Sequence, residues 1–183
     1  LNEHYIKGYH CTKLLDWNEV RSCGLRPLDV GCVSSLVIKE LENAGIPKEL
    51  INSVKDSYCQ FGKEVGYSNR ENMVWFVLSK NIIYNSGCSE FFEFFGGEVT
   101  RRALWDIRDE IYPKLRNIGI STVVECRLRF SEAPPYQKNN IAREIIEFGI
   151  NKYVDNRDYI PYCEMYVRVP IESYDILDIW KKE

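Results

Sequence analysis

The side chains best able to do chemistry in this chain lie near its two ends. His4 and His10 are the only two histidines among 183 residues, and His10 is followed directly by Cys11. A cysteine beside a histidine can supply a nucleophile and its base. However, the segment 5–13 is predicted to be a strand, in which neighbouring side chains point to opposite faces. The sequence therefore disfavours a cysteine–histidine nucleophile at this position.

Other common catalytic signatures are missing. The chain contains no GxxxxGK[ST], GxGxxG, GxSxG or HExxH pattern, which excludes the phosphate loop, the dinucleotide fold, the hydrolase elbow and the zinc protease. Its seven cysteines are scattered without a CxxC pair, so no zinc or other metal site is expected. Scattered cysteines without a signal peptide favour reduced thiols and a cytoplasmic location.

Composition and charge bound the class of protein. With 45% hydrophobic and 28% charged residues, the chain is typical of one globular domain. A net charge of −3 gives no polybasic signature, although a local groove can be positive on an acidic protein. Apolar runs are too short to span a membrane, so no membrane partner is expected.

The elements that must position the chemistry follow from hydrophobic periodicity and from turn signals. Strands are predicted at 5–13, 73–80, 121–130, 162–169 and 176–180. Helices are predicted from Asp16 to Gly24 and at 34–43, 47–64, 89–95, 98–117 and 140–152. Early helices between strands, with further strands clustered late, predict an α+β fold rather than a doubly wound parallel sheet.

The most informative segment is 8–13, with the sequence GYHCTK, followed by a short helix and then Gly24-Leu25. A strand holds the His10 imidazole rigidly, and the short Thr12 side chain leaves room for a planar ring. This pattern resembles the opening of the ADP-ribosyltransferase superfamily, in particular the His–Tyr–Glu branch that contains diphtheria toxin and the poly(ADP-ribose) polymerases. Cys11 stands where that family often has glycine. The resemblance implies that His10 bonds the nicotinamide ribose of NAD and that neighbouring backbone groups hold the carboxamide.

A second motif lies near the other end of the chain. The segment 162–169 (YCEMYVRV) leads through Pro170 into the last predicted strand, and it resembles the family's final motif. The resemblance implies that Glu164 bonds the ribose 2′-hydroxyl and stabilises the positive charge that develops as nicotinamide leaves, the electrostatic logic of glycosidases. Glu125 is the rival acid, but Arg127 and Arg129 share its predicted strand face, which favours a structural ion pair.

The middle of the chain resembles the family more loosely than the two end motifs do. Trp75 to Ser79, with Tyr84 beyond, looks like the region whose aromatic residue stacks on nicotinamide, although Trp75 and Phe76 also suit a core. Gly96-Gly97 is either an ordinary turn or a close backbone approach to a ligand. The implied catalytic residues are His10, Tyr84 and Glu164, and the implied NAD-binding residues are His10, Cys11, Thr12, Phe76, Ser79 and Tyr84. Candidates for binding the pyrophosphate are Arg26, Arg70, Arg101 and Arg102.

The resemblance implies one ADP-ribosyltransferase-like domain over residues 1–183, with a helical insertion at about 30–70. Two small, mostly antiparallel sheets would form a split β-sandwich with NAD, as substrate, between them. The expected activity is transfer of ADP-ribose to a macromolecular acceptor (RNA, DNA or protein), as in bacterial toxins and antiviral defence effectors, with an antitoxin protein as a further implied partner. Two alternatives stay open: an RNA 2′-phosphotransferase, and a catalytically silent module that binds a nucleotide or a protein.

Overall fold

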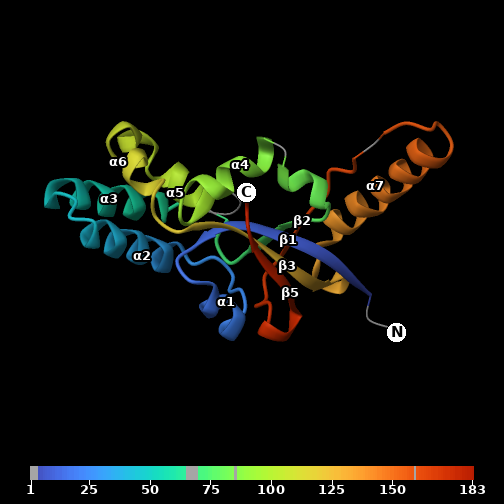
Figure 1. Ribbon diagram of the computed structural model, residues 1–183, viewed down its shortest axis with the longest axis horizontal. Coiled ribbons are helices and arrows are strands. Elements are labelled where there is room, and N and C mark those ends of the chain that lie inside the picture. The colour runs from blue at the N-terminus through green and yellow to red at the C-terminus, as the bar shows by residue number, and fades with distance from the viewer. Residues whose placement is uncertain (1–3, 65–69, 85, 159) are drawn as a thin grey trace.

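The computed structural model describes residues 4–64, 70–84, 86–158 and 160–183, and its centre is one antiparallel sheet (Figure 1). The strand order is β4-β2-β1-β3-β5. The strands are β1 (Tyr5–Leu14), β2 (Val74–Val77), β3 (Ile120–Arg129), β4 (Glu164–Val167) and β5 (Ile176–Lys181). The predicted α+β class is therefore confirmed.

The expected division into two small sheets is wrong for the described residues, because β1 is paired on both of its edges. It runs beside β3 over its whole length, from Tyr5 opposite Arg129 to Leu14 opposite Ile120. On the other edge Tyr9 lies opposite Val77 of β2, and β2 in turn pairs with β4. Alternating hydrophobicity shows which side chains are buried, but it does not show which strands are neighbours, so the sequence could not reveal this junction.

The pairing of β1 with β2 is confined to one described position, Tyr9 opposite Val77. Beyond it the two strands diverge, and we call the opening between residues 10–14 of β1 and residues 73–76 the fork. By comparison, β1 pairs with β3 at ten positions. The fork is therefore a local gap in an otherwise continuous sheet.

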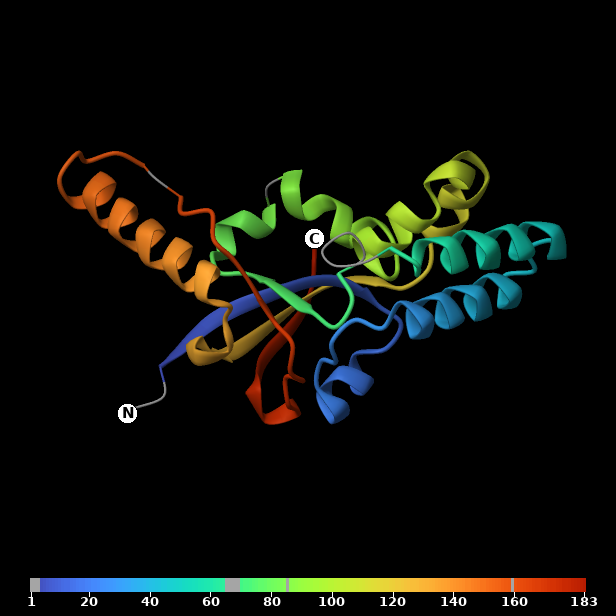
Figure 2. The same ribbon diagram turned by 180° about the vertical axis from the view of Figure 1, so that it is seen from behind.

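Helices cover both faces of the sheet and extend beyond it (Figures 1 and 2). They are α1 (Trp17–Cys23), α2 (Val30–Asn43), α3 (Lys48–Phe61), α4 (Ser86–Glu93), α5 (Gly97–Ala103), α6 (Arg108–Leu115) and α7 (Pro135–Tyr153). The pair α2 and α3 occupies the segment predicted as a helical insertion. None of the described helices combines the length and the apolar character that crossing a bilayer requires.

Three hydrophobic clusters hold these elements together. One lies on the sheet face that includes Phe76, Val124 and Met165, and it extends to Val20 of α1 and Ile141 of α7. A second joins the opposite face to Cys88 and Phe92 of α4. The third is helical and packs α2 and α3 against α5 and α6. The sheet and the helical layer therefore have separate cores.

Several predicted helices have different bounds in the structure, and two of the differences have a clear physical reason. The long helix expected at 98–117 is two helices, α5 and α6, separated by the 3-10 turn Trp105–Ile107. The apolar face predicted for that helix consists of Leu104, Ile107, Ile111 and Leu115. Leu104, Ile111 and Leu115 are buried and Ile107 is partly buried, so the apolar face is kept across the break. Helix α7 starts five positions earlier than expected, at Pro135, because proline fits the first turn of a helix.

Candidate active site

A cavity of about 240 Å³ opens at the fork. Residues 9–14 of β1 and 73–77 form two of its walls. The loop between α1 and α2 and the junction between α4 and α5 close it, and most of the lining is apolar or aromatic. Its volume lies just below the range of about 300–1,000 Å³ typical of small-molecule sites. The cavity therefore suits part of a dinucleotide or a smaller ligand.

His10 is the imidazole that lines this cavity. Its Nδ1 donates a hydrogen bond of 2.8 Å to the carbonyl oxygen of Trp75 across the fork, and its ring centroid lies 5.8 Å from that of Phe76. Burial lowers the pKa of His10, against the opposing effect of the Trp75 carbonyl. The imidazole is therefore neutral at pH 7, and because Nδ1 carries the proton, Nε2 is left as a hydrogen-bond acceptor.

Glu164 is the first residue of β4 and lines the same cavity. Its strand partner is Val77, which is in turn the partner of Tyr9, so Glu164 lies at the base of the fork on the sheet face of Tyr9 and Val77. His10, one position after Tyr9, lies on the other face with Phe76, so the two residues border the cavity from opposite faces of the sheet. The Tyr162 hydroxyl donates a hydrogen bond of 2.9 Å to Glu164 Oε1. Tyr162 is half-exposed, and its partial burial together with the bond to Glu164 raises its pKa to about 12, so the phenol stays protonated and keeps donating.

Three basic side chains also line the cavity: Lys13, Arg26 and Arg70. Arg70 lies over the indole of Trp75, with its Cζ 4.2 Å from the ring centroid, and its Nη2 is 2.6 Å from Glu98 Oε2. Glu98 is a second carboxylate in the lining. The cavity therefore combines apolar walls with both signs of charge.

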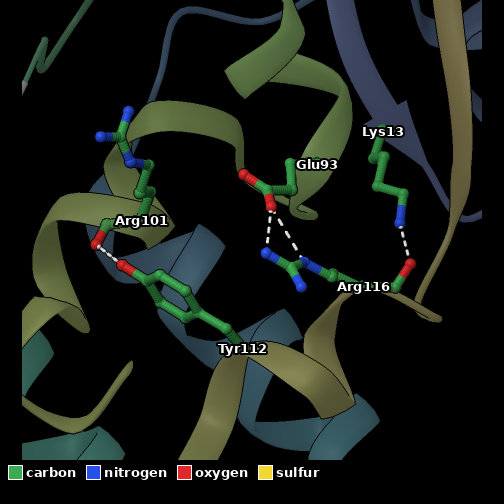
Figure 3. A network of polar contacts seen from close by, with 5 residues as sticks. All are labelled: Lys13, Glu93, Arg101, Tyr112 and Arg116. Atoms are coloured by element: carbon green, nitrogen blue, oxygen red, sulfur yellow. Dashed lines mark hydrogen bonds and ion pairs between the residues drawn. The ribbon is translucent and has the colours of Figure 1, made fainter. Parts of the chain in front are cut away.

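Lys13 is buried at the far end of the fork, and burial lowers its pKa. Its ammonium group donates to the carbonyl oxygen of Arg116, after α6 (Figure 3). The Arg116 guanidinium binds Glu93 of α4, with Nε 2.9 Å from Oε1, and Tyr112 donates to the carbonyl of Arg101. This network connects the end of β1 to the helical layer and fixes the wall beside the fork.

Left-handed backbone conformation explains the paired glycines at the junction of α4 and α5, and side-chain crowding adds to it at Gly96. Gly96 and Gly97 have φ values of +80° and +58°, in the left-handed region that favours glycine. A Cβ on Gly96 would meet the Thr100 hydroxyl and would lie 2.6 Å from Val33 Cγ1. Both glycines line the cavity, so this turn also brings main chain to the site.

Five of the seven predicted site residues border the cavity. His10, Cys11, Thr12, Phe76 and Glu164 all line the cavity. Ser79 and Tyr84 do not belong to its lining. Tyr84 is 61% exposed, and the Lys182 ammonium lies 4.4 Å from its ring centroid.

Several lining residues were missed or discounted in the sequence. Phe91 and Phe95 lie in a predicted helix, and nothing in their spacing distinguished them from core residues. The sequence signal that could have indicated Glu98 as a lining residue was the Gly96-Gly97 pair directly before it. Of the four predicted pyrophosphate-binding arginines, Arg26 and Arg70 line the cavity, whereas Arg101 and Arg102 do not belong to its lining.

The rival acid Glu125 takes part in an ion pair, but with a partner that was not expected. Its Oε1 lies 2.7 Å from Lys7 Nζ on the adjacent strand. Arg127 pairs instead with Asp175, at 2.8 Å. Arg129 lies 3.6 Å from Glu132. Glu125 does not belong to the cavity lining, which leaves Glu164 and Glu98 as its carboxylates.

The cysteine beside His10 is poorly suited to nucleophilic catalysis. A hydrogen bond with the Cys88 thiol, together with burial, raises the pKa of Cys11 far above its usual range. The thiolate that a nucleophile needs is therefore scarce. Within the described part of the chain, no group of three or more His, Cys, Asp or Glu residues could hold a metal ion.

No protein-family model, curated protein or solved structure matches this chain.

Proposed function

We propose that this protein is an NAD-dependent ADP-ribosyltransferase whose active site is the cavity at the fork. One observation carries the proposal: His10 and Glu164 are separated by more than 150 positions in the sequence, yet both line the same cavity. They do so in a fold with one sheet, whereas the family resemblance implied two. These are the two residues to which the resemblance assigns the ribose contact and the charge stabilisation.

The chemistry of the lining supports binding of the nicotinamide half of NAD. The neutral His10 offers Nε2 as an acceptor for a ribose hydroxyl. Phe91 and Phe95 provide flat apolar surfaces for a planar ring and are better placed for stacking than Tyr84, whereas the Trp75 indole is covered by Arg70 and Tyr166. Arg26 and Arg70 are suited to the charge of the diphosphate.

In the proposed reaction the bond between the ribose C1′ and the nicotinamide nitrogen breaks, and nicotinamide leaves with the bonding electrons. Positive charge then develops on the ribose, and a carboxylate at Glu164 stabilises it electrostatically. An acceptor nucleophile forms the new bond to C1′ and loses its proton to solvent or to a base. RNA, DNA and protein are the proposed acceptor classes, and control by an antitoxin remains a prediction.

Nicotinamide release from NAD by the purified protein tests the proposal. Glu164→Gln keeps the side chain's shape and removes its charge, so release should fall by about 100-fold or more, the usual scale for one electrostatic contributor. Glu125→Gln is the matched control, a carboxylate in the same sheet but outside the cavity lining, and it should retain activity. Addition of RNA, DNA or lysate protein in separate reactions identifies the acceptor class that accelerates release.

Equal activity in Glu164→Gln and the parent protein would refute the site. NAD binding without turnover under every condition would instead identify a catalytically silent nucleotide-binding module. These outcomes are distinguished by measuring NAD binding calorimetrically beside the release assay.

A second activity is favoured by one observation, the three basic residues Lys13, Arg26 and Arg70 around His10. An RNA 2′-phosphotransferase relies on a basic pocket of several arginines and histidines. The lining supplies these three basic residues and His10, although Arg70 pairs with Glu98 and Lys13 donates to the Arg116 carbonyl. An RNA oligonucleotide with an internal 2′-phosphate, incubated with the protein and NAD, tests this activity. Loss of the 2′-phosphate would select the phosphotransferase over the transferase.

A further inference from the structure

Helix α7 projects away from the sheet (Figure 1), and its buried side chains lie on one side of it. On that inner side Gln137 and Ile141 are buried. Gln137 Oε1 accepts a hydrogen bond of 3.0 Å from the backbone N–H of Tyr166 in β4. Glu144 and Phe148 continue the same side at helical spacing and are partly buried.

The opposite side of α7 carries an exposed apolar stripe, which consists of Ala142, Ile146, Ile150 and Tyr153. Ile146 is 62% exposed, Ile150 47% and Tyr153 76%. These positions follow a spacing of four, four and three residues, so they form one continuous ridge on a helix. Contiguous exposed apolar surface of this kind marks a site of association.

Gly149 lies beside this ridge in the interior of α7, where glycine weakens a helix relative to alanine. A Cβ at Gly149 would have nothing within 4 Å, so packing inside the chain does not require glycine there. The missing side chain leaves room for the close approach of another surface.

The charge around the stripe distinguishes between kinds of partner. Between residues 135 and 158 there are four basic and four acidic residues, which is unlike the Lys- and Arg-rich polar face of helices that lie on lipid. Arg143 and Glu147 flank the stripe together, with Arg143 Nε 3.8 Å from Glu147 Oε1. A flank that carries both signs at this spacing is complementary to its own copy.

We propose that the stripe is covered by the same stripe of a second copy, with the two α7 helices antiparallel about a two-fold axis at Ile146. This register places Ala142 opposite Ile150 of the other copy, small against large. It also places the exposed Asn139 opposite Tyr153, and Arg143 within one helical turn of Glu147 of the other copy. Such self-complementarity is what a two-fold symmetric interface demands.

The second copy would also lie close to the candidate site. Asn140 and Arg143 of α7 line a groove that is continuous with Glu164, between α7 and residues 162–164. The dimer would therefore narrow the outer mouth of this groove. The association itself does not depend on the proposed transferase activity.

Sedimentation equilibrium of the full chain tests the proposal. We expect a reversible dimer at concentrations up to about 0.5 mM, the range in which a small interface of this type associates. Ile146→Glu should weaken dimerisation at least tenfold. Leu36→Glu, at an exposed position on α2, is the control and should leave the dimer intact.

Charge exchange separates this interface from a general loss of folding. Arg143→Glu and Glu147→Arg should each weaken the dimer, and the double variant should restore it, because each copy then offers the reversed pair. A monomer throughout the concentration range would overturn the proposal, as would an Ile146→Glu protein that still dimerises. Sedimentation of the monomer with phosphatidylcholine–phosphatidylserine vesicles, abolished by Ile146→Glu, would assign the stripe to a lipid surface instead.

Discussion

The Tyr162 hydroxyl lies 2.9 Å from Glu164 Oε1, and the two residues are two positions apart where the chain enters β4. Side chains at this spacing in an extended segment point to the same side, so the contact is local and needs no rearrangement. The phenol keeps its proton at neutral pH because burial and the carboxylate raise its pKa to about 12. Tyr162 thus orients one oxygen of Glu164 and leaves the other available.

Removal of this hydroxyl should lower activity without harming the fold. Because a hydrogen bond of this kind contributes about 0.5–1.5 kcal/mol, Tyr162→Phe should reduce the rate of nicotinamide release by about threefold to tenfold. Tyr174→Phe, at another exposed tyrosine, is the matched control and should be neutral. An unchanged rate in Tyr162→Phe would show that the bond does not position Glu164.

The neutral state of His10 predicts a specific dependence of stability on pH. Its pKa is lowered in the folded state from the ordinary value of 6.5, so the unfolded chain binds more protons between those two pKa values. The contribution of His10 to the free energy of unfolding should be constant above about pH 7.5. It should fall as the pH drops through 6.5 toward the folded-state pKa. Urea denaturation at a series of pH values measures it.

His10→Gln should flatten this dependence, whereas His4→Gln, at the exposed second histidine, should not. If the parent protein and His10→Gln lose stability in parallel below pH 6.5, the imidazole is not held neutral by the fold.

The turn at Gly96 should be intolerant of a side chain. Gly96→Ala should reduce the free energy of unfolding by about 2–4 kcal/mol, because it combines a left-handed φ with overlap on Thr100 and Val33. Gly45→Ala is the control: its φ is +70° but nothing lies within 4 Å, so only the conformational term of about 1 kcal/mol applies. Chemical denaturation of both variants gives the comparison. Equal losses would mean that the space around Gly96 can relax.

Thiol reactivity should distinguish three exposed cysteines, Cys23, Cys32 and Cys59. The Asp29 carboxylate raises the pKa of Cys32, so its thiolate fraction at pH 7.5 is reduced. Brief treatment with iodoacetamide, followed by peptide mass mapping, should show Cys32 labelled last of the three. Asp29→Asn should accelerate Cys32 and leave the other two unchanged. Faster labelling of Cys32 than of Cys59 in the parent protein would contradict the assignment.

Local signals predicted much of the fold. The alternation that indicated strands at 5–13 and 121–130 corresponds to β1 and β3, and Asp16 and Gly24 bound α1 as expected. In contrast, the pairing of β1 on both edges depends on contacts between distant segments, and the resemblance to a split sandwich gave the wrong sheet count. The break after Leu104 lies inside an unbroken apolar period, which helix patterning alone cannot detect.

The site residues that could be predicted from the sequence are those whose position along a strand alone determines whether they reach the cavity. His10 and Thr12 reach the cavity because they lie on β1 beyond the last pair with β2, and Glu164 because it begins β4. Tyr84 was selected by its distance along the chain, whereas the 3-10 turn Lys80–Tyr84 leaves it on the surface. Glu125 illustrates the same limit, since its partner Lys7 comes from the neighbouring strand rather than from its own.

The fork gives β1 two edges with different protection of their amide protons. The edge against β3 is paired at ten positions, so its amides should exchange with solvent only when the sheet opens as a whole. Amides of residues 11–13 that face the fork lie outside the β1–β2 pairing and should exchange from the folded state. Hydrogen exchange along this one strand would therefore report global stability on one side and occupancy of the cavity on the other.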